Sequence, residues 1–272
     1  MDAAPPVSQI DSREVAALRW YHTIELPGGV LTPGEYDLRP IVDRLPWPAS
    51  LAGMRCLDIG SRDGFYAFHM ERLGADEVVS LDIADPDLMH FPGSRPPVAE
   101  IQAELDAGNR AFETARTALG SRVERSHAGI YAATRERLGS FDFAVIGTLL
   151  HHLRDPARAL AAARGVVDGG LLVNEAIIPG VASLSRRPLA ELVVSASPFW
   201  STANPAGLRR MVETAGFEVL EVGRPYLVPN GPGARRLAFG EYFAHPLRDL
   251  PRRLLLRRGA PHAWLLAKTV VR

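Results

Sequence analysis

Two glycines and one acid in the first third of the chain have the spacing of a nucleotide-type binding site. The stretch CLDIGSRDGFYAF predicts a buried strand, a loop and a helix, with Gly60 and Gly64 at the ends of the loop. Glycine lacks the Cβ that would keep backbone N–H groups away from a ligand. Asp82 stands at the end of the next predicted strand, where a carboxylate can accept hydrogen bonds from both hydroxyls of a ribose. The pattern therefore predicts a nucleotide-like cofactor.

The residues inside the loop decide between two kinds of cofactor. A nicotinamide fingerprint reads G-x-G-x-x-G, whereas here Arg62 takes the position of the second glycine, next to Ser61. S-adenosylmethionine (SAM) carries no pyrophosphate and does not require that glycine, and its cationic sulfonium and ammonium groups suit the preceding Asp58. We therefore predict SAM. The alternative is that the two glycines serve only a tight strand–helix turn and that the acid after the second strand only caps its loop.

Histidines follow the fourth predicted strand and also occur in the N-terminal segment. Methyl transfer from a sulfonium is an in-line displacement, and a hydroxyl or amine acceptor must lose a proton to a base. Imidazole titrates near neutral pH, so His151 is the first candidate for this base, followed by His152 and then His22. Glu175, in the fifth strand, could orient the base or the acceptor. The competing interpretation is structural, with the histidines packed or bonded to backbone and Glu175 a buried acid satisfied by backbone.

The elements that must position these residues alternate regularly. Strands are predicted at 55–60, 77–83, 123–130, 141–150 and 170–178, and helices at 64–73, 99–119, 132–138 and 156–166. This alternation favours a doubly wound α/β fold with a mostly parallel sheet. In such a sheet, ligands bind beyond the carboxyl ends of the strands. Gly169 and Gly170 are expected to form a turn into the fifth strand.

The N-terminal segment is expected to form a lid. Short helices are predicted at 8–20 and 38–45, on either side of a turn-rich loop at 25–37. Aromatic residues next to a turn-rich loop fit a lid that folds over the cofactor. We expect residues 1–48 to form a helical lid and residues 49–272 to form the SAM-binding domain.

The C-terminal third departs from the regular alternation. Asn204 and Pro205 predict the start of a helix, and strands are predicted at 216–223 and 260–271, the last of which could pair antiparallel at a sheet edge. The connection at 224–261 is rich in arginine. Its charge could hold tRNA phosphates or an anionic small molecule, or could form a solvated helix face.

Composition narrows the class of protein. The 272 residues have formal net charge zero, which argues against a surface built wholly for nucleic acid. The single cysteine, Cys56, can form no internal disulfide, and neither a signal peptide nor a stretch of about 20 apolar residues is visible. A cytoplasmic protein without a membrane anchor is expected. No spacing of histidine, cysteine and carboxylate residues completes a metal set, so we expect no metal.

Several stretches together are similar to a known family. LDIGSRDG, VVSLDI, FDFAVIGTLLHHLRDPARAL and GGLLVNE resemble the class I SAM-dependent methyltransferases over residues 50–220. WYHTIELPGGVLTPGEYD adds a resemblance to the narrower branch related to the tRNA wobble-uridine carboxymethyltransferase. The resemblance implies a Rossmann-like fold and SAM contacts at Gly60 and Asp82, with Ile130 and Tyr131 on either side of the adenine. The alternative for Ile130 and Tyr131 is a plain core position.

The sequence departs from the tRNA enzyme where that enzyme holds the extra carboxylate of carboxy-SAM. His151 aligns with the tyrosine of the branch and His262 with its arginine, and no lysine occurs near Trp20. A carboxylate requires a reliably charged donor, and histidine is only partly charged near neutral pH. Plain SAM and methyl transfer are therefore predicted.

The expected site residues fall into two sets. The cofactor set is Asp58, Gly60, Ser61, Gly64, Asp82, Ile83, Gly129, Ile130, Tyr131 and Thr148. The acceptor set is Trp20, Tyr36, Glu175, Trp200 and His262, with His151, His152 and His22 as candidate bases. The favoured function is methylation of a small-molecule hydroxyl in a biosynthetic pathway. The alternatives are a tRNA wobble-uridine (carboxy)methyltransferase and a non-catalytic SAM-binding protein.

Overall fold

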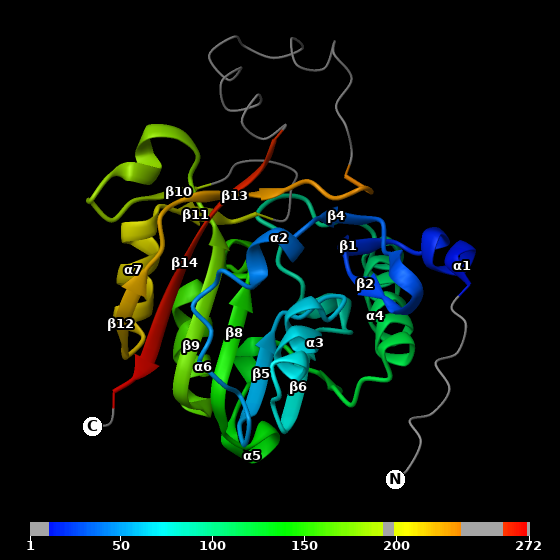
Figure 1. The fold of residues 1–272 in the computed structure, drawn as a ribbon. Helices are drawn as coiled ribbons and strands as arrows, with labels where there is room; N and C mark the ends of the chain where they lie inside the picture. Colours follow the sequence, from blue (N-terminus) through cyan, green and yellow to red (C-terminus); the bar gives the residue numbers. More distant parts are fainter. Residues whose placement is uncertain (1–10, 193–198, 235–257, 271–272) are drawn as a thin grey trace.

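The strands predicted from the sequence form one central sheet. The computed structural model describes residues 11–192, 199–234 and 258–270. Within these ranges, eight strands pair in the order β12-β14-β9-β8-β5-β6-β7, with β13 also bonded to β14 (Figure 1). They are β5 (Arg55–Ile59), β6 (Glu77–Asp82), β7 (Glu124–His127), β8 (Phe141–Gly147), β9 (Val167–Ala176), β12 (Phe217–Val222), β13 (Tyr226–Pro229) and β14 (Gly259–Thr269).

The sheet is parallel except on one side. β6 pairs in parallel with β5 and β7, and β8 pairs in parallel with β5 and β9. β14 runs antiparallel to β9, and its other edge carries β12 and β13. The predicted Rossmann-like fold with an antiparallel strand is therefore confirmed. The antiparallel strand itself lies one position inside the edge, because β12 and β13 cover it.

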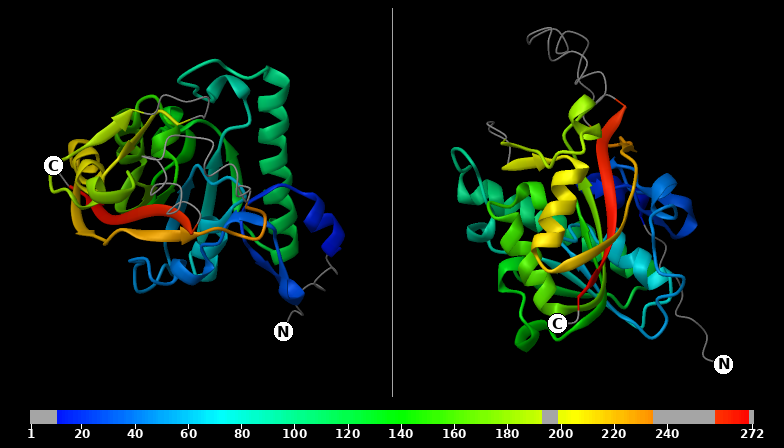
Figure 2. Two further views of the ribbon diagram at one scale, coloured as in Figure 1. Left: turned by 90° about the horizontal axis from the view of Figure 1, so that it is seen from above. Right: turned by 90° about the vertical axis from the view of Figure 1, so that its left-hand side faces the viewer.

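Alternate residues of the parallel strands enter two hydrophobic clusters, one on each face of the sheet. Cys56 belongs to the cluster under α3 (Phe65–Arg72) and α4 (Val98–Leu119), whereas Leu57 belongs to the cluster with α6 (Pro156–Val166) and α7 (Pro205–Thr214). Figure 2 shows helices on both faces of the sheet. Successive side chains of a strand point to opposite faces, so covering both faces requires nearly continuous apolar strands.

Short strands make up much of the N-terminal segment. α1 (Ser12–Ala17) ends before residue 20, the predicted limit of this helix, because Trp20–His22 form β1 instead. The segment continues with β2 (Glu25–Leu26), a 3-10 turn (Pro27–Gly29), β3 (Val30–Leu31), β4 (Gly34–Tyr36) and α2 (Arg39–Val42). β1 pairs in parallel with β4, and a Cβ at Gly34 would lie 2.1 Å from the carbonyl carbon of His22. Only glycine permits this close pairing.

Gly169 and Gly170 lie inside β9 and not in the predicted turn, because β9 starts directly after α6. A Cβ at Gly169 would lie 2.1 Å from the carbonyl oxygen of Asp142, and one at Gly170 would lie 2.7 Å from the ring of Phe143. Glycine serves close strand contact here, and a sequence pattern alone does not distinguish this need from a turn.

Some predicted loops contain regular structure, and some predicted elements are shorter. Ala190–Leu192 (β10) pairs antiparallel with Ser201–Ala203 (β11), and β13 lies within the arginine-rich connection. Most arginines of that connection fall at 235–257, outside the described residues. The short helix predicted at 132–138 is α5 (Arg135–Leu138). Among the helices that the structure describes, none combines the length and apolar character needed to cross a bilayer.

Candidate active site

A cavity opens at the carboxyl ends of the parallel strands. Its volume is about 1350 Å³, larger than the roughly 300–1,000 Å³ of a pocket for one drug-sized ligand. Loops after the parallel strands line it, together with β1 and the start of β14. Six of the eight histidines of the chain are among the lining residues: His22, His90, His127, His151, His152 and His262. The volume suffices for a cofactor and a second molecule.

The loop from Gly60 to Gly64, called the cofactor loop below, is held in shape by buried contacts. Gly60 has φ 76°, and its N–H donates to β6 at 2.8 Å. Asp58 accepts hydrogen bonds from the Ser61 hydroxyl at 2.6 Å and from Ala67 N at 3.0 Å. Burial raises the pKa of Asp58 to about 6. Gly60 lines the cavity, whereas Asp58, Ser61 and Gly64 stand behind it and support the loop.

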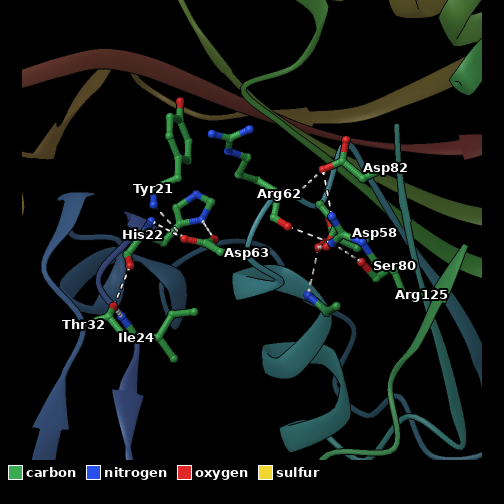
Figure 3. A network of polar contacts seen from close by, with 12 residues as sticks. Tyr21, His22, Ile24, Thr32, Asp58, Arg62, Asp63, Ser80, Asp82 and Arg125 are labelled. Atoms are coloured by element: carbon green, nitrogen blue, oxygen red, sulfur yellow. Dashed lines mark hydrogen bonds and ion pairs between the residues drawn. The ribbon is translucent and has the colours of Figure 1, made fainter. Parts of the chain in front are cut away.

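Asp82 lines the cavity at the end of β6. Its carboxylate accepts hydrogen bonds from Arg62 N at 2.6 Å and from Ile83 N at 2.7 Å. Figure 3 shows the bond that ties Asp82 to the cofactor loop. Each carboxylate oxygen has two lone pairs, so Asp82 keeps capacity to accept further hydrogen bonds from a ligand in the cavity.

Arg125, in β7, connects the cofactor loop with the sheet, and it was not among the predicted site residues. Its guanidinium donates to Arg62 O at 2.7 Å and to the Ser80 hydroxyl at 3.0 Å, and it lies 3.4 Å from Asp82. The side chain is 7% exposed, and burial lowers its pKa. An arginine within a short predicted strand is the signal that the sequence offers for this role.

The residue after Asp82 and the loop after β7 also line the cavity. Four members of the expected cofactor set line it here: Ile83, Gly129, Ile130 and Tyr131. Ile130 is also part of the hydrophobic cluster with α6, so the core and cavity interpretations of this residue both apply. The Tyr131 ring stacks on His90, with centroids 5.5 Å apart. The stack gives this end of the cavity a flat aromatic surface.

His151 and Glu175 form a buried pair at the cavity. His151 lies in a 3-10 turn at Leu150–His152, after β8 has ended at Gly147 and not at residue 150 as predicted. Its Nδ1 lies 2.8 Å from one Glu175 oxygen, and the other oxygen accepts from Leu150 N at 2.7 Å. Burial disfavours both charges: it lowers the pKa of His151 to about 4 and raises the pKa of Glu175 to about 7. His151 lines the cavity and Glu175 stands behind it.

A second histidine–carboxylate pair joins the N-terminal segment to the cofactor loop. His22 Nδ1 lies 2.6 Å from Asp63, which also accepts from His22 N at 2.7 Å and from Tyr21 N at 2.8 Å (Figure 3). Burial on its own would raise the pKa of Asp63, but the contacts with His22 and Tyr21 outweigh it and the pKa is lowered. Asp63 was not among the predicted site residues, although it stands in the middle of the loop that the sequence singled out.

His262, at the start of β14, uses both ring nitrogens. Its Nδ1 donates to Ala260 O at 2.9 Å, and its Nε2 lies 3.1 Å from the Thr148 hydroxyl. Burial lowers the pKa of His262 to about 4, so the ring is neutral at pH 7. Thr148 has φ 55°, a strained conformation for a β-branched residue. Both residues line the cavity.

A profile of the methyltransferase domain family matches residues 33–222. The chain belongs to this methyltransferase family. With the Rossmann-like sheet, membership identifies the protein as a class I SAM-dependent methyltransferase with SAM as its cofactor. The narrower resemblance to the wobble-uridine branch is not confirmed by the comparisons and stays a prediction.

The methyltransferase is similar to a curated relative and to solved structures. The ubiquinone biosynthesis O-methyltransferase of Aromatoleum aromaticum is 28% identical over 141 residues, covering 50% of this chain and 49% of the relative. The methyltransferase thus spans about half the length of that relative. The N-terminal domain of EvdMO1, solved in the presence of S-adenosylhomocysteine (SAH) and D-fucose, is 16% identical, with coverage of 95% and 94% and a TM-score of 0.53. The 1,6-didemethyltoxoflavin-N1-methyltransferase of Burkholderia thailandensis is 14% identical, with coverage of 81% and 72% and a TM-score of 0.45.

Arg62 of the methyltransferase connects the cofactor loop to the N-terminal segment. Its guanidinium pairs with Glu104 of α4, and the same carboxylate pairs with Arg19, next to β1. The backbone of Arg62 has φ 53°, a left-handed conformation that non-glycine residues rarely adopt. The side chain that replaces the second glycine of a dinucleotide loop therefore takes part in an ion-pair bridge.

Aromatic rings form part of the cavity wall near His151. The rings of His151, His152 and Phe199 lie with centroids 4.0–4.9 Å apart. In the acceptor set, Trp20, Tyr36 and His262 line the cavity, whereas Glu175 and Trp200 do not. Trp200 is adjacent all the same, because its backbone N–H donates to His151 O at 2.7 Å. In the described ranges, no cluster of three or more His, Cys, Asp or Glu residues is placed to hold a metal ion.

Proposed function

We propose that the methyltransferase methylates a hydroxyl group of a small molecule, with His151 as the general base. The observation that carries this proposal is the His151–Glu175 pair at the cavity, with Nδ1 of the imidazole 2.8 Å from the carboxylate. A base in contact with the acceptor, oriented by a third group, is the general arrangement for activating a hydroxyl nucleophile. His22 has a comparable pairing but belongs to the N-terminal segment.

The residues of the cofactor side fit SAM. Asp82 would accept the ribose hydroxyls, Gly60 would keep the loop free of a side chain at the cavity, and Ile130 with Tyr131 would flank the adenine. Bound SAM supplies an electrophilic methyl group on a sulfonium. The fit is supported by the remaining acceptor capacity of Asp82 and by a cavity volume that leaves room for an acceptor.

The His151–Glu175 pair provides the proton transfer. With Nδ1–H donated to Glu175, Nε2 of His151 carries the lone pair that takes the proton of the acceptor hydroxyl. With SAM bound, the acceptor oxygen would take the methyl group as SAH leaves, and the proton would later pass from His151 to solvent. Glu175 stabilises the imidazolium that forms. The low pKa of His151 keeps the imidazole in the neutral form that this role requires at pH 7.

The same low pKa favours an acidic acceptor. Proton transfer to a weak base is most favourable when the donor hydroxyl is itself acidic. We therefore propose a phenol or enol hydroxyl in preference to an alkyl alcohol. The name of the curated relative, an O-methyltransferase of ubiquinone biosynthesis, supports oxygen as the methylated atom and a small biosynthetic acceptor.

His262 supports plain SAM over carboxy-SAM. Both of its ring nitrogens already have partners, and burial keeps the ring neutral. It therefore does not supply the permanent positive charge that an extra carboxylate would need. Calorimetry with SAM and carboxy-SAM tests this point, and tighter binding of carboxy-SAM would contradict it.

Replacement of His151 tests the base. With an acceptor found by screening phenols and sugars for SAM consumption, we expect His151→Ala to lower kcat by about 10²–10⁴ while the Kd of SAH changes less than about twofold. Added imidazole should restore part of the activity, because the deleted group is the base itself. Unchanged turnover in His151→Ala would remove this residue from the mechanism.

The pH profile tests the role of Glu175. Its pKa of about 7 means that it becomes the ionised partner of His151 Nδ1–H as the pH rises through neutrality. We expect kcat of the wild type to rise through about pH 7 and this step to be absent in Glu175→Gln. An identical step in Glu175→Gln would assign it to another group.

A further inference from the structure

We propose that Asp63 is a positioning residue that couples the cofactor loop to the acceptor side of the cavity through β1. This inference rests on the proposed function, because it assumes that cofactor and acceptor share the cavity. Asp63 contacts neither of them; it acts through Tyr21 and His22, which line the cavity.

The first step is the attachment of β1 to the cofactor loop. Asp63 is 1% exposed, and its carboxylate accepts two consecutive backbone N–H groups, those of Tyr21 and His22. These two N–H groups bond to a side chain of the cofactor loop instead of to a neighbouring strand, as Figure 3 shows. Hydrogen bonds from several donors to one carboxylate favour its charged form, which agrees with the lowered pKa of Asp63.

The second step is the orientation of the His22 ring. Nδ1 of His22 is bound to Asp63, and the ring packs at 5.2 Å from the ring of Phe65 and 4.7 Å from that of Tyr21. The Tyr21 ring in turn packs at 5.2 Å from Tyr36. Asp63 thus holds in place both the backbone of β1 and the side chain of His22.

The third step connects Asp63 to the cofactor position. The preceding residue, Arg62, donates its backbone N–H to Asp82 and accepts from Arg125 through its carbonyl oxygen. Its side chain reaches Glu104, which also holds Arg19 beside β1. A ligand that hydrogen-bonds to Asp82 therefore favours the loop conformation in which two adjacent residues, Arg62 and Asp63, both hold β1. Such coupling is reciprocal, so an ordered β1 also favours the ligand.

Hydrogen exchange tests the coupling without an identified acceptor. The experiment compares the hydrogen-exchange rates of the Tyr21 and His22 backbone amides with and without saturating SAH. Calorimetry follows SAH binding separately. In the wild type we expect SAH to slow exchange roughly 5- to 150-fold, the usual range of coupling between sites. Asp63→Asn places an amide N–H₂ group next to the backbone N–H groups of Tyr21 and His22. In this variant we expect these two amides to exchange faster than in the wild type, and SAH to slow them by less than about twofold.

Two further variants keep the result specific. Asp76→Asn makes the same chemical change at an exposed acid that accepts from Gly53 N, and we expect wild-type exchange at Tyr21 and His22. His22→Phe removes only the side-chain bond to Asp63, and we expect it to keep most of the SAH effect, because both backbone bonds remain.

The outcomes separate the inference from the proposed function. SAH binding to the wild type with unchanged exchange at Tyr21 and His22 would overturn the coupling and leave the methyltransferase proposal standing, even if Asp63→Asn does not fold. A full SAH effect in a folded Asp63→Asn would also overturn it. Failure of SAH to bind the wild type would contradict the cofactor site, and the coupling with it. With an acceptor in hand, Asp63→Asn should raise the KM of the acceptor more than it lowers kcat.

Discussion

The two walls of the cavity are built in different ways. The wall that we propose to hold the cofactor, called the cofactor wall, consists of a loop, a strand end and an acid from adjacent parallel strands. Backbone groups hold much of it in place, as in the bond from Arg62 N to Asp82. The wall that we propose to face the acceptor, called the acceptor wall, brings together His22, His151 and His262 from β1, the turn after β8 and β14. Its polar groups are fixed mainly by side chains that are far apart in the sequence.

This difference affects how each wall is expected to respond to substitution. A wall held largely by backbone geometry tolerates many side chains, except at the positions of positive φ, which here are Gly60, Gly64 and Arg62. A wall held by side-chain pairs such as His151–Glu175 changes its chemistry with a single substitution. We therefore expect few residues to decide which acceptor binds, whereas the fold positions the cofactor.

The largest effect is expected from a change in the cofactor wall. Gly64 has φ 89°, and a Cβ there would lie 2.5 Å from the Phe68 ring and 2.7 Å from the Phe112 ring. We expect Gly64→Ala to lower the free energy of unfolding by about 2–5 kcal/mol, through backbone strain and overpacking. Urea denaturation measures this loss.

Gly74 offers the matched control. Its φ is 91°, but no atom lies within 4 Å of the position that a Cβ would take. We expect Gly74→Ala to cost about 1 kcal/mol, from strain alone. Equal losses for the two variants would show that packing against Phe68 and Phe112 does not constrain the loop.

A medium effect is expected from Asp82→Asn, which removes the charge that would accept the hydroxyls of the cofactor. Hydrogen bonds to a charged acceptor contribute about 1.5–3 kcal/mol, so the Kd of SAH should rise about 10- to 100-fold. Glu175→Gln, on the opposite wall, should leave this Kd within about twofold while it lowers turnover. A Kd change of similar size in both variants would show that the two walls are not separable.

The smallest effect concerns buried histidines. His69 lies outside the cavity, 4.7 Å from the Trp47 ring, and burial lowers its pKa to about 4, as it does for His151 and His262. An unfolded histidine has a pKa near 6.5, so between pH 6.5 and 4 the unfolded chain binds a proton that the folded chain does not. The free energy of unfolding therefore decreases as the pH is lowered from 6.5 to 4.

His69→Phe isolates that contribution. Relative to the variant, the wild type should lose about 1 kcal/mol of unfolding free energy per pH unit between pH 6.5 and 4. Denaturation series at several pH values measure the difference. A constant difference would mean that burial does not lower the pKa of His69, and it would weaken the same explanation for the two cavity histidines.

Much of the cofactor wall could be predicted from the sequence. Gly60 and Asp82 lie within short, periodic stretches, and local patterns place such stretches at the end of a strand. Gly169 and Gly170 show the limit of this reasoning, because the contacts that require glycine there come from Asp142 and Phe143 on the neighbouring strand. The helix predicted at 8–20 ends at Ala17 for a similar reason: Trp20 pairs with β4 as part of β1, and this pairing outweighs local periodicity.

By itself, the sequence determined the alternating sheet, the position of the cofactor loop and the acid that follows the second strand. Strand periodicity and glycine placement are local properties, so they can be recognised from the sequence alone. Only the tertiary structure decided which acid pairs with which histidine. Asp63 pairs with His22 and Glu175 pairs with His151 because packing brings separate segments to one cavity. No local sequence pattern specifies these contacts.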